Sequence, residues 1–333
     1  MYHPHLIALS AKVRPLSKRK PSIVVSIGHA AHVQLFRYLI ARWQQRGWSV
    51  DVVCRAKPLV KELLQAAHIP YTEISRPGCW YGQGVELLVH HARMLVRLIR
   101  HRPNLVISVA GILATPPARL LGIRSAIVYD TEDAVMSNRI AYPFANHVLT
   151  PQGYLFDCGK KHTRFPSFHE LAYSHPNRFV LNNEVITRYG LDKRPYVVVR
   201  FVRHSATHDA GQQGFGETGR ARLLDQIMAQ GYDLWITSEE KLPARYESMC
   251  HWAPGPDILH LLAGARAYIG ESPTMAMEAG ACGTPAAWVS TRVGKLGYVI
   301  EMEHEFGLVR SYRESADFFK DFDFHVLSEL ASI

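Results

Sequence analysis

Short runs of Val, Ile and Leu alternate along the chain with segments in which apolar residues recur every three or four positions. The runs are typical of strands buried on both faces, and the periodic segments predict amphipathic helices. The clearest strands are expected at residues 22–27, 105–109, 196–202 and 267–270, and the clearest helices at 33–46, 85–102, 220–230 and 274–282. Strands that alternate with helices in this way predict parallel sheets covered by helices on both faces.

The alternation stops between residues 151 and 190, where three prolines occur and no long periodic segment is found. We interpret this stretch as the crossing between domains, since 333 residues exceed one average domain. The sequence therefore predicts an α/β protein of two Rossmann-like doubly wound domains that face a cleft. The expected parts are a basic N-terminal arm at 1–20, a first domain at 21–165, a second domain at 166–310, and a C-terminal helix at 311–333 that packs back on the first domain.

The composition narrows the class of protein. With 47% apolar and 20% charged residues the chain can bury a sizeable core. No apolar stretch is long enough to predict a membrane-spanning helix, and the N-terminal apolar run is too short for a signal peptide. The five cysteines are scattered without a CxxC pair, and the histidines show no metal-ligand spacing. We therefore expect a cytoplasmic protein without a metal or a cofactor.

The positive charge is concentrated near the N-terminus. Residues 1–20 contain five Lys or Arg and no acid, so they contribute +5 of the formal net charge of +9. A solvated tail is the simplest interpretation, and an anionic membrane surface or a polyphosphate ligand also fits; a nucleic-acid partner is not indicated. The predicted helix at 85–102 is basic as well, with seven Arg or His against Glu86. We expect its apolar face to cover the sheet, with peripheral membrane association at the inner face as the alternative.

The segment 268–285 carries the most chemistry. A buried strand is expected to end at Gly270, followed by Ser272 as a good helix N-cap and Pro273 at the first helical position. Such a helix start offers backbone N–H groups and a positive dipole end to a phosphate. Glu278 lies four residues after Thr274 on the same helical face, where its carboxylate could accept hydrogen bonds from two ribose hydroxyls. An ordinary capped helix with Glu278 in water is the alternative.

This segment resembles the nucleotide-sugar signature of GT-B glycosyltransferases and of the UDP-N-acetylglucosamine 2-epimerases. In that signature an acid-Ser-Gly-Gly pattern precedes a Glu and then Gly-x-Pro; the Ser and the helix start hold the diphosphate, and the Glu holds the ribose. Ser272 and Glu278 match by position, Glu271 stands where an Asp is usual, and Pro273-Thr274 replaces the glycine pair, which removes one backbone donor. The nucleotide-sugar contacts that the resemblance implies in this segment are Gly270, Glu271, Ser272, Thr274, Met275 and Glu278.

Three more segments share a resemblance with a narrower group. They begin Gly28-His29-Ala30-Ala31-His32, Asp130-Thr131-Glu132-Asp133 and His169-Glu170-Leu171-Ala172-Tyr173. Together they resemble a bacterial and archaeal family of GT-B-like proteins that is catalogued as a domain of unknown function, over residues of about 23 to 285. This resemblance implies the GT-B fold, in which the first domain binds the acceptor and the second binds the nucleotide sugar.

The resemblance also implies catalytic residues. In GT-B transferases the first loop faces the acceptor, and a His there can be the general base; His29 and His32 lie in this loop, and His32 is our choice because it is closer to the helix. Glu132 is the nearest match to a catalytic Glu of the 2-epimerases. Arg203-His204 resembles, in reversed order, an epimerase motif that approaches the diphosphate. Helix capping and complementation of a helix dipole are the alternatives for the histidines and for Glu132.

The function predicted from the sequence is transfer of a sugar from a UDP-sugar to a glycan or lipid-linked acceptor by a GT-B-type glycosyltransferase, in surface-polysaccharide or glycoconjugate synthesis. A UDP-N-acetylglucosamine 2-epimerase-like enzyme and a catalytically inert nucleotide-sugar-binding protein are the alternatives. The GxGxxG pattern at residues 214–219 is interpreted as a loop, because no strand immediately precedes it.

Overall fold

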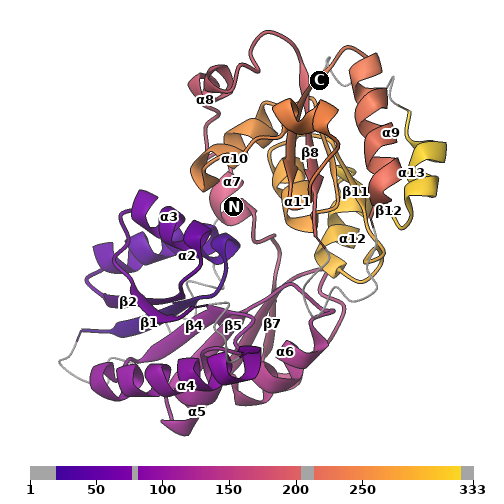
Figure 1. Ribbon diagram of the computed structural model, residues 1–333. Helices are drawn as coiled ribbons and strands as arrows, with labels where there is room; N and C mark the ends of the chain where they lie inside the picture. The colour runs from indigo at the N-terminus through magenta and orange to yellow at the C-terminus, as the bar shows by residue number, and fades with distance from the viewer. Residues whose placement is uncertain (1–19, 77–81, 204–213, 324–333) are drawn as a thin grey trace. The chain divides into compact units, whose positions relative to one another are not determined.

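The protein consists of two compact units, Met1–Ala172 and Tyr173–Ile333 (Figure 1). The computed structural model describes residues 20–76, 82–203 and 214–323. The basic arm, apart from Lys20, lies outside these residues. The division between the units falls a few residues after the boundary expected at 165.

The first unit is built on a seven-stranded parallel sheet in the order β3-β2-β1-β4-β5-β6-β7. Its strands are β1 (Ser22–Ile27), β2 (Ser49–Arg55), β3 (Thr72–Ser75), β4 (Leu105–Val109), β5 (Arg124–Val128), β6 (His147–Pro151) and β7 (His162–Phe165). The four-residue strand β7 lies in the stretch that we interpreted as a crossing. Only Phe165 of β7 is fully buried, so the strand has no apolar run that would predict it.

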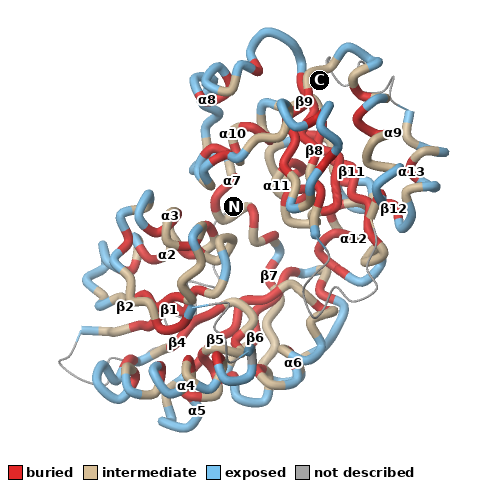
Figure 2. The backbone as a smooth tube through the Cα atoms, in the orientation of Figure 1, coloured by how far each residue is buried: buried red, intermediate tan, exposed pale blue. Residues whose placement is uncertain are grey.

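Both faces of this sheet are covered. Ile23, Val25 and Ile27 of β1 belong to one apolar cluster, whereas Val24 packs with Met94 in another. Side chains of a strand alternate between its two faces, so a strand buried on both needs apolar residues throughout. The helices of this unit are α2 (Ala30–Gln45), α3 (Pro58–Ala66), α4 (Gly82–His101), α5 (Thr115–Leu120) and α6 (Val135–Ala141), with 3₁₀ turns η1 (Tyr142–Phe144) and η2 (Gly159–Lys161). Figure 2 shows the buried strands between these helices.

The second unit contains a five-stranded parallel sheet in the order β12-β11-β10-β8-β9. Its strands are β8 (Tyr196–Phe201), β9 (Asp233–Ser238), β10 (Ala267–Gly270), β11 (Ala286–Val289) and β12 (Val309–Tyr312). The helices are α8 (Asn183–Arg188), α9 (Gly216–Ala229), α10 (Gly255–Ala263), α11 (Pro273–Ala281), α12 (Gly297–His304) and α13 (Ser315–Asp321), with η3 (Ala244–Met249); the short α7 (Leu171–Ser174) spans the division. Two parallel α/β units confirm the predicted fold class.

The described part of the C-terminal tail belongs to the second unit. Phe318 of α13 is fully buried in that unit's core, edge-on to Phe215 and Tyr312 with ring centroids 5.2 Å apart in both pairs. The sequence predicted instead a helix over 311–333 packed on the first domain. The described residues form a strand and a short helix, because the aromatic residues of the tail complete the core of the second unit. Residues 324–333 lie outside the described part.

The strand order reverses once in each sheet, between β1 and β4 in the first and between β8 and β10 in the second. At such a point neighbouring connections leave in opposite directions, and ligands of open α/β sheets bind there, at the carboxyl ends of the strands. Gly28-His29 follows β1, and Glu271-Ser272 follows β10. The topology therefore places both predicted motifs at switch points of their own sheets.

Candidate functional site

His29 and His32 lie at the start of α2, directly after β1. His29 is the N-cap of this helix, and its Nδ1 accepts the Ala31 N–H at 3.3 Å. Nδ1 of His32 accepts the Gly28 N–H at 3.1 Å. Because a backbone amide can only donate, Nδ1 of each ring carries no proton, and the neutral ring carries its hydrogen on Nε2.

The protonation states of these two rings correct the predicted base. Burial, with the Lys57 ammonium adding to the effect, lowers the pKa of His29 to about 4. Burial also lowers the pKa of His32 well below its usual value, with His29 adding to the effect. Both rings are therefore neutral near pH 7, and each has only an Nε2–H to present. A general base needs a lone pair, so the geometry makes His32 and His29 hydrogen-bond donors rather than bases.

In its neutral form His169 can present a lone pair instead. Its Nδ1 lies 2.7 Å from Oδ2 of Asp130, whose Oδ1 accepts the Thr131 hydroxyl at 2.9 Å. Burial alone would lower the pKa of His169, but the Asp130 carboxylate outweighs it and raises that pKa. Burial would raise the pKa of Asp130, and His169 turns the shift downward. With Nδ1–H directed at the carboxylate, neutral His169 holds its lone pair on Nε2, a buried atom without a hydrogen-bond partner among the described residues.

His32, Asp130 and His169 form one electrostatic cluster. The charges of Asp130 and His169 both act on the His32 ring, although the three residues follow different strands, β1, β5 and β7. Neither Asp130 nor His169 was predicted as a site residue from the sequence. Both lay in segments that carried the family resemblance, and prediction of β7 would have placed His169 at the carboxyl edge of the sheet.

Glu132 has a different environment from Asp130, two residues before it. Glu132 is 2% exposed, and its Oε1 accepts the Leu155 N–H at 3.1 Å. The carboxylate thus joins the loop after β5 to the loop after β6. This bond gives Oε1 of Glu132 a structural role, and Asp130 is the carboxylate that faces the histidines.

In the second unit the start of α11 is built as predicted. Ser272 is the N-cap, its Oγ accepts the Met275 N–H at 3.4 Å, and Pro273 occupies the first helical position. The buried hydroxyl of Tyr268 accepts the Ser272 N–H at 3.2 Å and donates to the Ser272 carbonyl at 3.1 Å, which fixes the turn. Pro273 has no N–H and the Met275 amide is already bound to Ser272. The backbone donor at this helix start is therefore the amide of Thr274.

Glu278 lies on the same helix, half-buried, and does not have the watery environment of the alternative interpretation. Its Oε1 accepts a hydrogen bond from the Tyr173 hydroxyl at 2.7 Å. Burial raises the pKa of Glu278 to about 7, against the opposing effect of this hydrogen bond. Any further hydrogen-bond donor that approaches this carboxylate stabilises its charged form and lowers its pKa.

Glu271 is buried, and its carboxylate accepts hydrogen bonds from groups of the protein itself. Its side chain has no exposed surface, and its carboxylate accepts the N–H groups of Val202 at 2.8 Å and Phe215 at 2.9 Å and an ion pair from Arg220 at 3.0 Å. A Cβ at Gly214 would collide with this carboxylate, so glycine is required there. The prediction that Glu271 touches the nucleotide sugar is therefore corrected, because its oxygens already serve protein donors.

Of the other predicted contacts, two pack inside the protein and one is exposed. Gly270 is a packing glycine, since a Cβ would meet the Tyr268 hydroxyl and the Arg200 carbonyl, and the Met275 side chain is in the core. Arg203 is exposed and lines a hollow of about 410 Å³ with Arg220, Lys241 and others. His204 lies outside the described residues. The GxGxxG pattern, interpreted as a loop, enters a helix, because α9 begins at Gly216.

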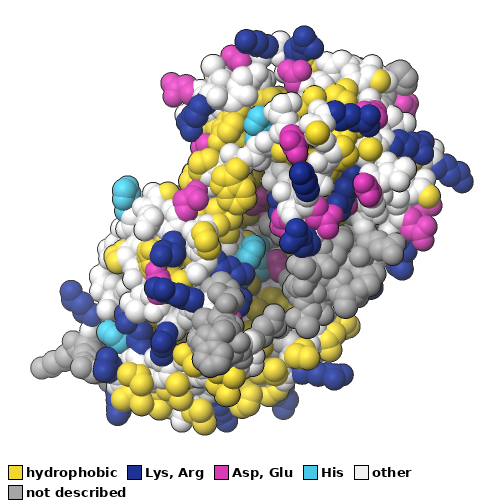
Figure 3. All heavy atoms as spheres, in the orientation of Figure 1, with side chains coloured by type: hydrophobic (Ala, Val, Ile, Leu, Met, Phe, Trp, Pro, Cys, Tyr) yellow, Lys and Arg dark blue, Asp and Glu magenta, His cyan; other side chains and the backbone are white. Residues whose placement is uncertain are grey.

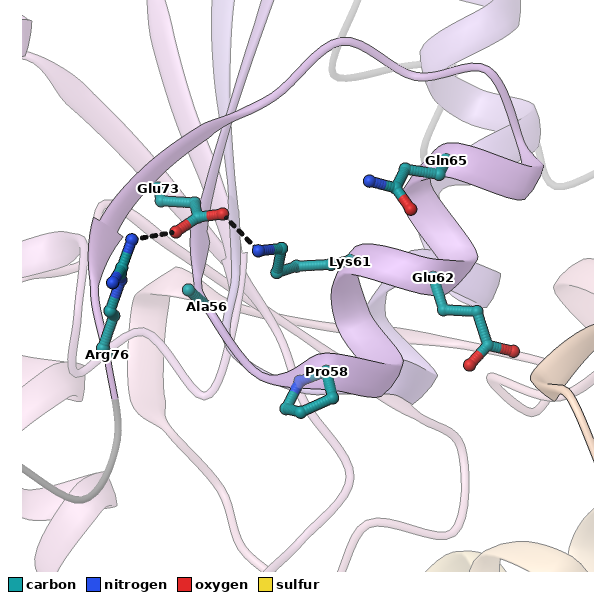
Figure 4. Close-up of a pocket in the computed structure, with 7 residues that line it drawn as sticks. All are labelled: Ala56, Pro58, Lys61, Glu62, Gln65, Glu73 and Arg76. Carbon is teal, nitrogen blue, oxygen red and sulfur yellow. Dashed lines mark hydrogen bonds and ion pairs between the residues drawn. The ribbon is translucent and has the colours of Figure 1, made fainter. Parts of the chain in front are cut away.

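A second hollow, of about 490 Å³, lies beside β2, β3 and α3 (Figure 4). Its charges are paired across it: Glu73 accepts from Lys61 at 2.9 Å and from Arg76 at 3.3 Å. Because Glu73 takes both cations, this hollow offers less to a charged ligand than its composition suggests.

Within the part of the chain that the structure describes, no three or more His, Cys, Asp or Glu side chains converge as a metal site would require. No helix of the described ranges combines the length and the apolar character needed to cross a bilayer.

Solved structures with a similar fold include two kinds of UDP-sugar enzyme. The UDP-GlcNAc 2-epimerase of Neisseria meningitidis, bound to UDP-GlcNAc, aligns over 93% of each chain with a TM-score of 0.71 and 11% identity. An S. aureus MnaA–UDP structure aligns over 94% of this chain and 91% of that one, with a TM-score of 0.67 and 10% identity. MurG of Acinetobacter baumannii aligns over 94% and 90%, with a TM-score of 0.52 and 15% identity. The fold is thus that of the GT-B proteins.

Sequence comparison gives two further matches. A UDP-N-acetylglucosamine–N-acetylmuramyl-(pentapeptide) pyrophosphoryl-undecaprenol N-acetylglucosamine transferase of Legionella pneumophila is 25% identical over 153 residues, which are 43% of this chain. The match spans only 41% of that relative's length. Residues 22–303 match the model of a family described as "Protein of unknown function (DUF354)".

Proposed function

Because the chain belongs to the DUF354 family, we propose its activity from its own residues: it is a GT-B-type glycosyltransferase that uses a UDP-sugar. In this proposal the second unit holds the nucleotide sugar and the first unit removes a proton from the acceptor hydroxyl. The observation that carries it is the Asp130–His169 pair, whose geometry leaves the lone pair of neutral His169 on Nε2 and whose charges act on His32, the histidine at the switch point of the first sheet.

The proton chemistry follows from the pair. Nε2 of His169 takes the proton of an acceptor hydroxyl as its oxygen bonds to the anomeric carbon of the donor sugar. The positive charge that develops on the ring is stabilised by the Asp130 carboxylate, 2.7 Å from Nδ1. The Nε2–H of His32 supplies a donor in the same cluster, suited to an oxygen of the acceptor or the sugar.

Departure of the nucleotide is the task of the second unit. The bond from the anomeric carbon to the diphosphate oxygen breaks, and UDP leaves with its negative charge. The Thr274 amide, the dipole of α11 and Arg203 are the groups that we assign to the diphosphate, and Glu278 accepts from the ribose hydroxyls. Ser272 contributes by holding the helix start, where its Oγ is bound to Met275.

The placement of Glu132 weighs against the 2-epimerase alternative. Epimerisation needs carboxylates that shuttle protons at the sugar ring, and one oxygen of the carboxylate expected to do so, Oε1 of the buried Glu132, is bound to the Leu155 amide. Transfer needs one base and one stabilised leaving group, for which both units offer candidates. We further propose a glycan or lipid-linked acceptor, a cytoplasmic location and a role in surface-polysaccharide or glycoconjugate synthesis.

The experiment is incubation of the protein with UDP-N-acetylglucosamine in the absence of an acceptor, followed by separation of the products. A transferase is expected to release UDP slowly, because water replaces the acceptor. His169→Gln, which keeps a hydrogen-bonding side chain but has no basic nitrogen, should abolish this release.

The other outcomes decide against the proposal. Formation of the 2-epimer without UDP release would assign the protein to the epimerases. Tight binding of UDP-N-acetylglucosamine without any turnover, also when other acceptors and UDP-sugars are supplied, would make it an inert nucleotide-sugar-binding protein.

A further inference from the structure

The longest helix of the first unit carries an apolar stripe on its solvent side. Val85, Leu88, Ala92, Val96 and Ile99 of α4 succeed one another at steps of three or four residues, and all are exposed, Leu88 by 68%. The step places them on one helical face. A soluble helix that only covered a sheet would present polar residues there.

The buried side of α4 is apolar only in its second half. Met94 and Leu98 pack on the sheet, but one and two turns before Met94 the buried positions are polar. Glu86 binds Arg55 through two bonds of 2.6 and 2.7 Å, and His90 lies 2.7 Å from the Ser75 hydroxyl. The expectation that the apolar periodicity of this helix covers the sheet is therefore wrong for the stripe, which packs against no buried cluster.

Exposed apolar residues continue from α4 onto its neighbours. Leu120, at the end of α5, is 75% exposed, and Met136 of α6 is 73% exposed; Val135 and Phe144 are exposed as well. Helix α5 packs between α4 and α6. Figure 3 shows apolar side chains gathered along the edge of the molecule that these helices form. We call the exposed apolar residues of α4, α5, α6 and η1 the α4–α6 face.

Around the α4 and α5 part of this face positive charges predominate. Residues 87–129 contain six Arg and no acid. Arg97 is bound to Asp51 and Arg93 to the Ile74 carbonyl, whereas Arg100, Arg102, Arg119 and Arg124 are exposed.

The described part of the chain begins near the same helix end. The amide of Ser22 donates to the Asn104 side chain at 2.8 Å. The start of β1 therefore lies beside Asn104, which is two residues after Arg102 in the sequence. Lys20 is exposed there, and the preceding residues include Lys12, Arg14, Lys18 and Arg19.

We propose that the α4–α6 face docks on an anionic lipid bilayer. Apolar side chains that project from a helix surface enter the boundary between headgroups and acyl chains, and flanking cations bind the negative surface of the leaflet. A second copy of the chain is the less suitable occupant, because a two-fold interface would bring the same cations against each other. The proposal is independent of the transferase chemistry, although it suits a lipid-linked acceptor.

The test is sedimentation of the full chain with vesicles. Vesicles of equal parts phosphatidylglycerol and phosphatidylcholine should bind the protein, vesicles of phosphatidylcholine alone should bind it at least tenfold more weakly, and high salt should weaken the binding to the anionic vesicles. The double variant Leu88→Gln/Ile99→Gln should lose tenfold or more of the affinity, because two apolar side chains no longer leave water. Each of Arg100→Gln and Arg119→Gln should lose about fivefold, the value of one cation at an anionic surface.

Matched controls come from the second unit. Val180→Gln and Lys193→Gln alter an exposed apolar residue and an exposed cation there, and should bind vesicles as the unaltered chain does. Circular dichroism and UDP release establish that the variants are folded and active. Equal binding to both kinds of vesicle, binding to neither, or full binding by Leu88→Gln/Ile99→Gln would overturn the proposal. A lipid-free dimer that Leu88→Gln/Ile99→Gln dissociates would assign the face to a second copy instead.

Discussion

Asp130 and Glu278 are carboxylates in corresponding regions of the two units, each near the carboxyl edge of a parallel sheet, yet their pKa values move in opposite directions. Burial pushes both upward. For Asp130 the imidazole of His169 reverses the effect and keeps the pKa below its usual value. For Glu278 the neutral hydroxyl of Tyr173 opposes burial only in part, and the pKa rises to about 7. The partner, more than the depth of burial, decides which carboxylate is a fixed anion.

The difference assigns separate tasks to the two regions. A carboxylate that stays charged can hold a histidine in one tautomer and stabilise its protonated form. A carboxylate poised near neutrality responds to the donors that a ligand brings, so it suits recognition. We therefore expect changes in the first unit to affect turnover and changes at Glu278 to affect nucleotide affinity.

The largest expected effect comes from His169. In His169→Gln the base is lost, and turnover of UDP-N-acetylglucosamine should fall by about 100- to 10,000-fold, the range for a general base. Affinity for UDP, measured by calorimetric titration, should change by less than about twofold, because the residues proposed to bind UDP belong to the second unit. His32→Gln is the matched control: it keeps a side-chain donor, and turnover should fall far less. Equal losses in both variants would contradict the distinction between the two histidines.

Glu271 is a third carboxylate in this comparison. Its partner is the cation Arg220, and the pair has a structural role. Glu271→Ala leaves two backbone amides unbonded and Arg220 with Glu240 as its acidic partner, and should lower the free energy of unfolding by about 2 to 4 kcal/mol. The control is Asp321→Ala, which breaks the exposed pair with Arg310 and should cost less than about 1 kcal/mol. Chemical denaturation of both variants measures the difference. Similar values for the two would show that Glu271 does not hold the loop.

The fold was predictable from the sequence wherever apolar runs were long. Strands β1, β4 and β10 begin and end at the expected residues, because each is buried on both faces. The strands that were missed, β3, β7 and β12, have four residues each and contain polar positions. A short strand on the outer part of a sheet has little apolar pattern to detect.

The site was predictable only in part, because a motif specifies positions and not hydrogen-bond partners. Ser272 and Pro273 follow from local capping rules, which sequence can express. The tautomer of His32 depends on the Gly28 amide, and the base character of His169 depends on Asp130, 39 residues earlier in the chain. The buried role of Glu271 likewise depends on Arg220, which contacts it only in the folded protein.

The affinity for UDP should respond to Glu278. Hydrogen bonds to a charged group contribute about 1.5 to 3 kcal/mol, so Glu278→Ala should weaken UDP binding by roughly tenfold or more. Glu278→Gln keeps one acceptor oxygen and should weaken it less. The helix retains its cap at Ser272, so both variants should fold as the unaltered chain does. Equal affinities across the three proteins in calorimetric titration would remove Glu278 from the site and weaken the nucleotide-sugar proposal.

The smallest effect tests the pKa of Glu278 directly. If UDP binds the ionised carboxylate, the apparent affinity scales with the ionised fraction, which for a pKa of about 7 rises through neutral pH. Affinity should therefore increase by up to about tenfold between pH 6 and pH 8 and then level off. The diphosphate of UDP also titrates near pH 6, so the control is Glu278→Gln, in which only the contribution of the diphosphate remains. A steeper increase in the unaltered protein than in Glu278→Gln assigns the difference to this carboxylate. Parallel pH profiles would mean that Glu278 keeps one protonation state throughout, and the contrast with Asp130 would then be one of position and not of charge.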